Sequence, residues 1–281
     1  MSDTTRTWFI TGTSRGLGLA LVRHLLERGD RVAATTRSTD RLMAALDGSP
    51  TEHLLPVAVD LTDENSDSAA VTATAERFGG IDVVVNNAGY GYLGAVEETS
   101  DADVRRMLEV QVNGTWNVLR AVLPGMRAAR SGHVITVSSV LGLLSFPGWG
   151  LYCAGKYAVE GLTESLAGEV AEHGIRVTIV EPGYFDTDFL RESSLEITQH
   201  AGDAYPGIRG MIETHLAMPG TQPGDPARAA AAIVAVTERA DGPLRQQLGS
   251  DSSALAADKA AALAADVAAG RDLAHSTDRV R

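Results

Sequence analysis

The chain has 281 residues, of which 44% are hydrophobic, and its formal net charge is −12. This acidic balance argues against a nucleic-acid partner or an anionic membrane surface. The single cysteine, Cys153, excludes an internal disulfide, and the seven histidines show no ligand spacing, so no metal site is expected. Residues 1–7 lack an apolar signal core and no apolar run approaches the ~18 residues of a membrane span, so we expect a cytoplasmic protein.

The first recognisable unit is a strand, a glycine-rich turn and a helix. Residues 7–11 form a short apolar run that predicts a buried strand. The turn that follows reads Gly12-Thr13-Ser14-Arg15-Gly16-Leu17-Gly18, and an amphipathic helix then runs to Gly29. Glycines let the backbone approach a pyrophosphate, and a helix N-terminus supplies free N–H groups. The unit predicts a dinucleotide site, with a turn that only helps packing as the alternative.

The second expected strand, residues 31–36, ends where a ribose-binding side chain is typical. An acidic residue at this point would bind both ribose hydroxyls and favour NAD. Thr36 and Arg37 stand there instead, and Arg15 from the glycine-rich turn can approach the same place. Two guanidinium groups favour a 2′-phosphate, so NADP(H) is expected over NAD(H). Two ordinary solvated arginines are the alternative.

Two further strands are expected at residues 54–59 and 81–85. The first ends at Asp60-Leu61, where Asp60 is placed either to accept from an adenine amino group or to cap the helix expected over 63–78. The second has the continuous apolar centre of a parallel strand and leads into Asn86-Asn87-Ala88-Gly89. Small and amide residues suit close packing beside a flat cofactor, although a plain turn also uses them.

A long helix is expected from Ser100 to about Arg130, followed by a strand at 133–137 that leads to Ser138-Ser139. Asn113-Gly114 lies within this helix, and both residues are poor helix formers. The pair predicts a local irregularity that frees a backbone carbonyl. The alternative is that the helix tolerates these two small residues because they pack against a neighbouring element.

Tyr152 and Lys156 lie four residues apart on the next expected helix, which runs to His173. Positions four apart share one helical face, and a nearby ammonium favours the phenolate. Tyr152 is therefore a candidate proton donor or acceptor. Many helices carry such a pair on their surface, so the motif by itself is weak.

The remaining chain predicts one more strand at 175–180, ending at Glu181-Pro182-Gly183. Residues 184–225 are irregular and rich in apolar side chains, which indicates a substrate lid. A helix (226–239), a strand (244–248) and an Ala-rich helical extension (250–274), packed on the body, complete the chain. Strands that alternate with helices predict one α/β domain, residues 1–281, built on a doubly wound parallel sheet.

These motifs, in this order, resemble the short-chain dehydrogenase/reductase family in its compact single-domain branch. They are TGTSRGLG at 11–18, Asp60, NNAG at 86–89, Asn113, Ser138-Ser139, YCAGK at 152–156 and PG at 182–183. The resemblance implies a Rossmann-type fold and NADPH as the hydride donor. It also implies that Ser139 holds a substrate carbonyl, that Tyr152 transfers the proton, that Lys156 lowers the pKa of Tyr152 and holds the ribose, and that Asn113 relays protons through a water.

The expected site falls into three sets. The catalytic set is Asn113, Ser139, Tyr152 and Lys156. The cofactor set adds Gly12, Ser14, Arg15, Gly16, Leu17, Gly18, Arg37, Asp60, Leu61, Asn87, Ala88, Gly89, Pro182, Gly183 and, at the nicotinamide end, Thr187. The substrate set is Tyr92, Leu141, Trp149 and Tyr184, and its apolar character suits a hydrophobic ketone or alcohol.

The expected activity is that of a carbonyl reductase or alcohol dehydrogenase. An epimerase or dehydratase on the same fold, or an NADP-binding sensor, are the alternatives. The protein is expected to form a homo-oligomer. An extension that covers the end of the sheet would restrict the assembly to a dimer rather than a tetramer.

Overall fold

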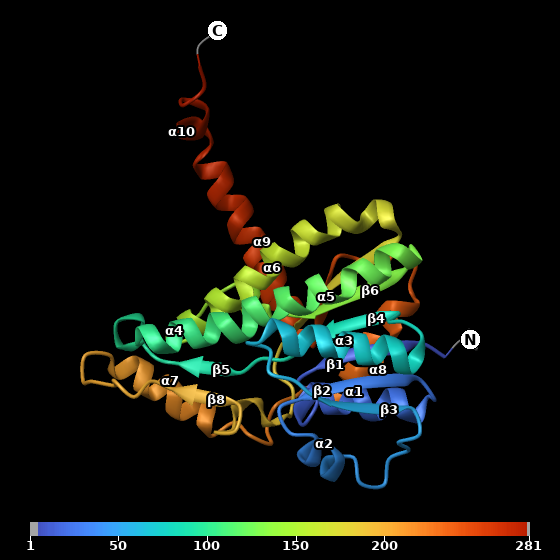
Figure 1. The fold of residues 1–281 in the computed structure, drawn as a ribbon. Coiled ribbons are helices and arrows are strands. Elements are labelled where there is room, and N and C mark those ends of the chain that lie inside the picture. Colours follow the sequence, from blue (N-terminus) through green and yellow to red (C-terminus); the bar gives the residue numbers. More distant parts are fainter. Residues whose placement is uncertain (1–4, 280–281) are drawn as a thin grey trace.

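A computed structural model describes residues 5–279 and is built on a seven-stranded parallel sheet (Figure 1). The strand order is β3-β2-β1-β4-β6-β7-β9, so successive strands run outward from β1 in one direction and from β4 in the other. The order reverses between β1 and β4, which is where open α/β sheets bind their ligands. The strands are β1 (Thr7–Thr11), β2 (Arg31–Thr36), β3 (Leu54–Ala58), β4 (Val83–Asn86), β6 (Gly132–Val137), β7 (Ile175–Pro182) and β9 (Arg245–Leu248).

Helices cover both faces of the sheet, and β1 shows why. Its side chains alternate, so Trp8 and Ile10 enter one apolar cluster while Phe9 enters the other. Helices α1 (Gly16–Glu27) and α8 (Pro226–Glu238) fill the first cluster. Helices α3 (Glu64–Phe78), α5 (Gly114–Ala129) and α6 (Gly150–Val170) fill the second. The predicted doubly wound Rossmann-type fold is confirmed.

The long helix expected over 100–130 is interrupted. Helix α4 (Asp101–Leu108) and α5 are joined by a π-helical turn, Glu109–Asn113. The irregularity predicted at Asn113-Gly114 is therefore present. A π-helical turn holds one residue more than an α-helical turn, so it changes which side chains face the sheet.

The segment 184–225 is more ordered than its sequence suggests. Strand β8 (Leu195–Ile197) pairs in parallel with β5 (Gly91–Leu93), and helix α7 (Pro206–Leu216) follows. Strands of three residues are too short to show an alternating pattern, which explains why neither was predicted. The pairing places this segment beside the residues that follow β4. A short helix, α2 (Thr39–Ala45), was also not predicted.

The C-terminal extension departs from its prediction. Helices α9 (Ser250–Ala269) and α10 (Arg271–His275) form as expected, but α9 contacts the rest of the protein only through its first turns, as far as Leu255 and Ala256. Residues 257–279 are exposed, and the helix projects away from the sheet (Figure 1). The expectation that the extension packs on the body is wrong beyond this point, because the helix has few large apolar side chains to bury.

Candidate functional site

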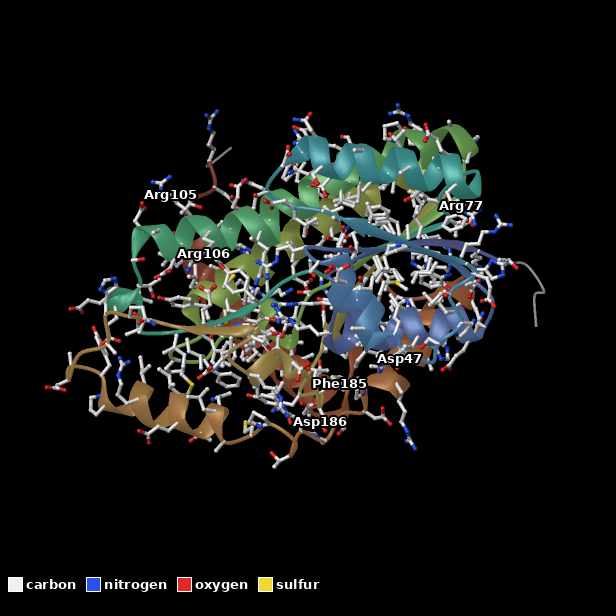
Figure 2. All side chains as sticks on the ribbon, turned by 60° about the horizontal axis from the view of Figure 1, so that its bottom comes forward. Asp47, Arg77, Arg105, Arg106, Phe185 and Asp186 are labelled. Atoms are coloured by element: carbon white, nitrogen blue, oxygen red, sulfur yellow. The ribbon has the colours of Figure 1, made fainter. Side chains whose placement is uncertain are left out.

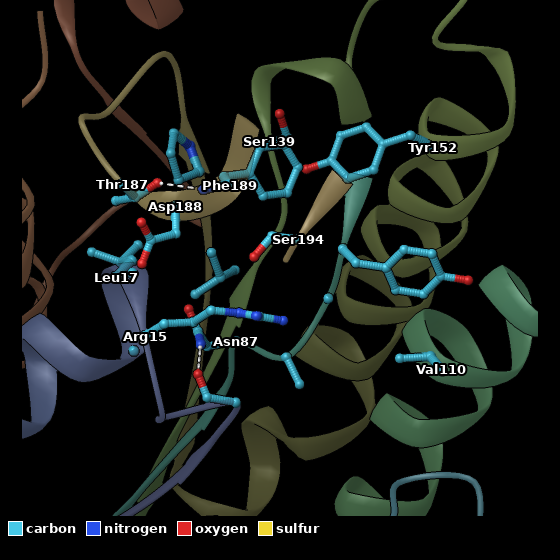
Figure 3. A pocket seen from close by; sticks show the side chains of 18 of the residues that line it. Arg15, Leu17, Asn87, Val110, Ser139, Tyr152, Thr187, Asp188, Phe189 and Ser194 are labelled. Atoms are coloured by element: carbon cyan, nitrogen blue, oxygen red, sulfur yellow. Dashed lines mark hydrogen bonds between the residues drawn. The ribbon is translucent and has the colours of Figure 1, made fainter. Parts of the chain in front are cut away.

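A cavity of about 570 Å³ opens at the carboxyl ends of the strands where the strand order reverses. Every residue of the three expected sets lines this cavity except Asn113 and Tyr92. The close view in Figure 3 shows Arg15 reaching into it from one side, with Ser139, Tyr152 and Phe189 on the other. The cavity therefore joins the glycine-rich turn to the Tyr152–Lys156 pair.

The glycine-rich turn is held against the end of β4 by close backbone contacts. Gly12 has φ of 71°, and a Cβ on it would lie 2.7 Å from Cα of Ala88. A Cβ on Gly18 would lie 2.4 Å from the carbonyl oxygen of Gly12 and 2.5 Å from Nδ2 of Asn87. These positions accept only glycine, and the first residues of helix α1, from Gly16 to Gly18, line the cavity.

Asn87, the residue after β4, joins the end of that strand to the end of β1. Its Nδ2 donates to the carbonyl oxygens of Thr11 (2.9 Å) and Gly12 (3.1 Å). The backbone N–H groups of Asn87 and Ala88 both donate to Oγ1 of Thr11, each at 3.0 Å. The sequence motif 86–89 therefore shapes the backbone of the turn, and its small residues leave the cavity open beside it.

The ribose end of the cavity carries two arginines. Arg37 follows β2 and is exposed, whereas Arg15 is partly buried. Burial lowers the pKa of Arg15, and the neighbouring positive charge of Arg37 lowers it further. Two guanidinium groups that repel one another at the cavity wall form a site that a bound anion would stabilise.

Asp60 lies at the same end of the cavity, but its carboxylate accepts hydrogen bonds from within its own turn. Its Oδ1 accepts from the N–H (3.0 Å) and the hydroxyl (2.7 Å) of Thr62, and these hydrogen bonds lower its pKa. The cap of α3 is a different residue, Asp63, which accepts from the N–H of Asn65. Asp60 thus shapes the turn that borders the cavity.

Tyr152 and Lys156 are both buried on the inner face of α6, with exposed fractions of 5% and 6%. Nζ of Lys156 donates to the carbonyl oxygen of Val137 at 2.9 Å and lies 5.7 Å from the ring centroid of Tyr152. Burial lowers the pKa of Lys156 to about 8. Burial raises the pKa of Tyr152, contrary to the expected lowering by Lys156, because the phenol has little contact with solvent. The phenol therefore keeps its proton at neutral pH.

Ser139 meets Tyr152 across the cavity. The side chain of Ser139 lies close enough to the phenol to lower the pKa of Tyr152, which opposes the effect of burial. Oγ of Ser139 also accepts from the N–H of Leu141 at 3.1 Å, which fixes the hydroxyl at the start of a short 3₁₀ turn. Ser138 is buried and points away from the phenol, toward Glu160. The choice of Ser139 over Ser138 agrees with this geometry.

The side chain of Asn113 does not line the cavity. Its expected role, the relay of protons through a water at the distorted helix, stays a prediction. Its side chain is exposed and donates to Oε2 of Glu109 at 2.7 Å. Gln111, in the same π-helical turn, faces inward instead. Gln111 is 2% exposed and donates from Nε2 to the carbonyl oxygen of Tyr90 at 2.8 Å. A Cβ on Gly89 would lie 3.7 Å from both Nε2 of Gln111 and Nζ of Lys156, which places Gln111 beside the lysine.

Tyr92 does not line the cavity, contrary to its expected place in the substrate set. It is 2% exposed, and its hydroxyl donates to Oδ2 of Asp103 at 3.0 Å on the far side of β5. Tyr90, two residues earlier and outside the strand, lines the cavity instead.

Residues from 184–225, the segment expected to form a lid, complete the substrate side. Tyr184 and Thr187 were expected in the site, whereas Phe189 and Asp251 stood in none of the three expected sets. The ring of Phe189 lies 5.5 Å from that of Tyr152, and Thr187 fixes the backbone by accepting from the N–H of Phe189 at 3.3 Å (Figure 3). Asp251, at the start of α9, accepts from the N–H of Tyr184 at 2.8 Å. The contacts of Phe189 with Tyr152 and of Asp251 with Tyr184 join segments far apart in the chain, so no local sequence pattern predicts them.

An ion pair ties this segment to α4. Figure 2 shows Arg105 and Arg106 as neighbours on that helix. Arg105 pairs with Asp101 of its own helix, whereas Arg106 reaches Oε2 of Glu196 in β8 at 2.7 Å. The ion pair and the pairing of β5 with β8 hold the segment over the cavity.

The chain also matches known proteins. A sequence profile described as short chain dehydrogenase matches residues 6–197. Oxidoreductase BOA17 of Botryotinia fuckeliana is 37% identical over 269 residues, which cover 96% of this chain and 98% of the relative. The chain belongs to the short-chain dehydrogenase family. It is an oxidoreductase of that family, and its Rossmann-type fold carries the nucleotide-binding site.

Solved structures agree with this assignment to the short-chain dehydrogenases. A short-chain dehydrogenase from Streptomyces avermitilis is 35% identical, with a TM-score of 0.90, and the match covers 99% of this chain and 100% of that one. A short chain dehydrogenase from Burkholderia cenocepacia, in complex with NADP, is 27% identical, with a TM-score of 0.72, and the match covers 98% of each chain. Within residues 5–279 of this dehydrogenase, no helix is both long and apolar enough to cross a membrane.

Proposed function

We propose that this protein is an NADP(H)-dependent oxidoreductase that transfers a hydride between the nicotinamide and a carbonyl or secondary alcohol of a hydrophobic small molecule. The observation that supports it most directly is the position of Tyr152 and Lys156, buried together on one wall of a cavity whose other end is the glycine-rich turn. A proton-carrying group and an anion-binding turn on one cavity are what hydride transfer to a carbonyl requires.

The cavity fits a dinucleotide by its shape. Gly12 and Gly18 lie where a Cβ would clash, so the backbone can approach a pyrophosphate at the N-terminus of α1. Asn87 and Ala88 border the central part, Lys156 would hold the ribose hydroxyls, and 182–187 would border the nicotinamide end. When bound, the cofactor supplies or accepts the hydride.

The preference for NADP(H) rests on the ribose end. Arg15 and Arg37 lie close enough to lower the pKa of Arg15, and β2 ends at Thr36 where NAD-binding sites carry a carboxylate. A 2′-phosphate would pair with both guanidinium groups and relieve their repulsion. The NADP-bound relative from Burkholderia cenocepacia is consistent with this choice.

The proton chemistry follows from the neutral state of Tyr152. In the reductive direction, the hydroxyl of Ser139 would hydrogen-bond the substrate carbonyl oxygen, and the phenol of Tyr152 would donate its proton to that oxygen as the carbon accepts the hydride. The ammonium of Lys156 would stabilise the phenolate that remains. The reverse sequence oxidises an alcohol.

The substrate side favours an apolar molecule. Trp149 packs edge-on against Tyr152 with ring centroids 5.5 Å apart. Other apolar residues around the reacting position are Leu141, Phe146, Tyr184, Phe189 and Leu255. A wall of this kind excludes water and binds hydrocarbon by burial, so a hydrophobic ketone or alcohol fits better than a sugar phosphate.

Substitution of Tyr152 by phenylalanine tests the proposal. We expect Tyr152→Phe to bind NADPH nearly as the wild type does, and to lower kcat by about 10³-fold across a panel of ketones, because the proton donor is lost. The rate is followed by the absorbance of the dihydronicotinamide. Tyr157→Phe is the matched control, since Tyr157 lies on the same helix but is exposed.

The outcomes separate the proposal from its alternatives. Wild-type turnover by Tyr152→Phe would remove the assigned role of the phenol. Tight binding of NADPH with no turnover of any carbonyl by the wild type would instead favour an NADP-binding sensor. Product formation with no net oxidation of the cofactor would favour an epimerase or dehydratase.

A further inference from the structure

A pair of buried carboxyl groups lies directly behind Lys156 and has no part in the chemistry proposed above. Glu160 follows Lys156 by one turn of α6, and Glu181 lies near the end of β7, just before the segment that borders the nicotinamide end. The exposed fractions of Glu160 and Glu181 are 4% and 0%. Two carboxylates this deeply buried require compensation by cations or by protons.

One guanidinium group contacts both carboxyl groups. Nε of Arg245, on β9, lies 3.1 Å from Oε2 of Glu160 and 3.5 Å from Oε1 of Glu181. The same side chain also pairs through Nη2 with the partly exposed Glu164, at 2.9 Å. Arg245 therefore carries one positive charge against three carboxyl groups, which is too little to balance them all in ionised form.

The hydrogen bonds of Glu160 and Glu181 also indicate that the two carboxyl groups are not both ionised. Oε2 of Glu181 accepts from Nε2 of Gln247 at 2.6 Å. Oε1 of Glu160 and Oε1 of Glu181 are both buried without a hydrogen-bond donor among the described residues, and both carboxyl groups contact Nε of Arg245, so they are close neighbours. An ionised carboxylate only accepts, so one proton between the two groups would satisfy both oxygens.

The surroundings determine which carboxyl group carries that proton. Burial and the charge of Glu160 raise the pKa of Glu181 to about 7. Burial also raises the pKa of Glu160, but the neighbouring hydroxyl of Ser138 and the ion pair with Arg245 act in the opposite direction. The proton therefore belongs on Glu181, and Glu160 is the ionised member.

The buried ammonium of Lys156 is stabilised by a nearby negative charge such as that of Glu160. Its Nζ is buried, and its hydrogen bond is to a neutral carbonyl oxygen, that of Val137. Glu160 opposes the effect of burial by raising the pKa of Lys156. Among the described residues, the other polar and charged groups that face the pair are Ser138, Glu164, Arg245, Gln247 and Ser252, whose hydroxyl donates to the carbonyl oxygen of Glu181.

We propose that Glu181 holds the shared proton and thereby leaves Glu160 ionised as the counter-charge of Lys156, which makes Glu160 a positioning residue for the acid–base group of this enzyme. The kinetic part of this inference rests on the proposed function. The part that concerns the shared proton does not, because it can be measured on the folded protein without a substrate.

Thermal unfolding tests the shared proton. Glu181→Gln keeps a donor toward Glu160 but cannot ionise. In the wild type, Glu181 must lose its proton as the pH rises through about 7, and this loss leaves two buried negative charges side by side. We expect the melting temperature of Glu181→Gln, relative to the wild type, to rise by about 5–10 °C between pH 5 and pH 8, because the unfolded chain has lost this proton by pH 5 whereas the folded protein loses it only near pH 7. Glu164→Gln, which removes a partly exposed carboxylate from the same cluster, should show no such gain.

The pH profile of turnover tests the counter-charge. Removal of the negative charge in Glu160→Gln should lower the pKa of Lys156, so the loss of activity at high pH should begin about one pH unit lower than in the wild type. A merely structural role would change kcat without moving the profile. Glu164→Gln is again the control and should retain the wild-type profile.

Two results would overturn the inference. Equal destabilisation of Glu181→Gln at pH 5 and pH 8 would show that Glu181 is ionised and acts as an ordinary ion-pair partner of Arg245. An unmoved pH profile in a folded Glu160→Gln would remove its role toward Lys156. If the wild type reduces no carbonyl, the proposed function fails, and the melting experiment still decides where the proton lies.

Discussion

Nζ of Lys156 donates a hydrogen bond to the main-chain carbonyl oxygen of Val137 at 2.9 Å. Val137 is the last residue of β6, so the hydrogen bond fastens the ammonium of α6 to the carboxyl edge of the sheet. The lysine is thereby held beside Tyr152 and cannot turn toward solvent. The hydrogen bond therefore fixes the charged end of the flexible Lys156 side chain where the proposed proton transfer occurs.

Replacement of this lysine should abolish most activity. We expect Lys156→Met to lower kcat/KM by at least about 10²-fold, because the phenolate loses its stabilising charge and the ribose loses a ligand. NADPH affinity, measured by fluorescence titration, should fall as well. The chain has one other lysine, Lys259, which lies exposed on α9 and offers a matched control. Equal losses in Lys156→Met and Lys259→Met would contradict the assignment.

The cofactor preference can be reversed at one position. Arg37→Asp places a carboxylate after β2, where it repels a 2′-phosphate and can accept from ribose hydroxyls. We expect the affinity for NADPH to fall by about 10-fold or more and the affinity for NADH to rise. Arg77→Asp makes the same charge change at an exposed position of α3, outside the cavity lining, and should alter both affinities little. An NADPH-to-NADH ratio that Arg37→Asp leaves unchanged would disprove the arginine argument.

Gln111 and Asn113 give a direct test of the register of the π-helical turn. Gln111→Leu removes the donor to the Tyr90 carbonyl oxygen and leaves it unsatisfied near Lys156, so we expect a loss of about 1–3 kcal/mol in the free energy of unfolding and a lower kcat/KM. Asn113→Ala loses a hydrogen bond on the surface and should change stability by less than about 0.5 kcal/mol. Denaturant unfolding and steady-state rates provide the measurements. Larger losses in Asn113→Ala than in Gln111→Leu would show that the side chain of Asn113, rather than that of Gln111, supports the site.

Asp67 should make the protein less stable as the pH rises. It is fully buried on α3, and burial, together with the charges of Asp63 and Asp60, raises its pKa to about 7. Between the unfolded pKa of about 4 and this value, unfolding releases a proton, so the free energy of unfolding falls with pH. Asp67→Asn carries no charge to desolvate and should become more stable than the wild type by about 2–4 kcal/mol at pH 8.

Urea unfolding of wild type and Asp67→Asn at several pH values provides the measurement. The difference between the two proteins should grow from pH 4 to pH 7 and then level off. Glu76→Gln, which removes an exposed carboxylate from the same helix, is the comparison. A difference that does not vary with pH would show that Asp67 is ionised in the folded protein.

Much of the fold could be predicted because its patterns are local. The glycine-rich turn, its strand and its helix are contiguous, and each parallel strand is a short apolar run with a turn at its end. Tyr152 and Lys156 share a face because helical geometry requires it. The family assignment and the Rossmann-type fold, both inferred from such segments, are confirmed.

Other features depend on contacts between distant segments. The burial of Tyr152 under Phe189 raises the pKa of the phenol, whereas the Tyr-Lys spacing alone suggested a lowering. The removal of Tyr92 from the cavity follows from the pairing of β5 with β8. Neither effect leaves a periodic signal in the sequence.

By itself, the sequence determined the nucleotide-binding turn and the proton-carrying pair, because each is encoded within a few consecutive residues. Only the tertiary structure decided that Gln111 faces inward rather than Asn113, that α9 projects into solvent, and that Glu181 meets Glu160 behind Lys156. The physical reason is the same in each case. Burial and electrostatic pairing depend on which segments meet, and segments meet through the whole fold rather than through their own composition.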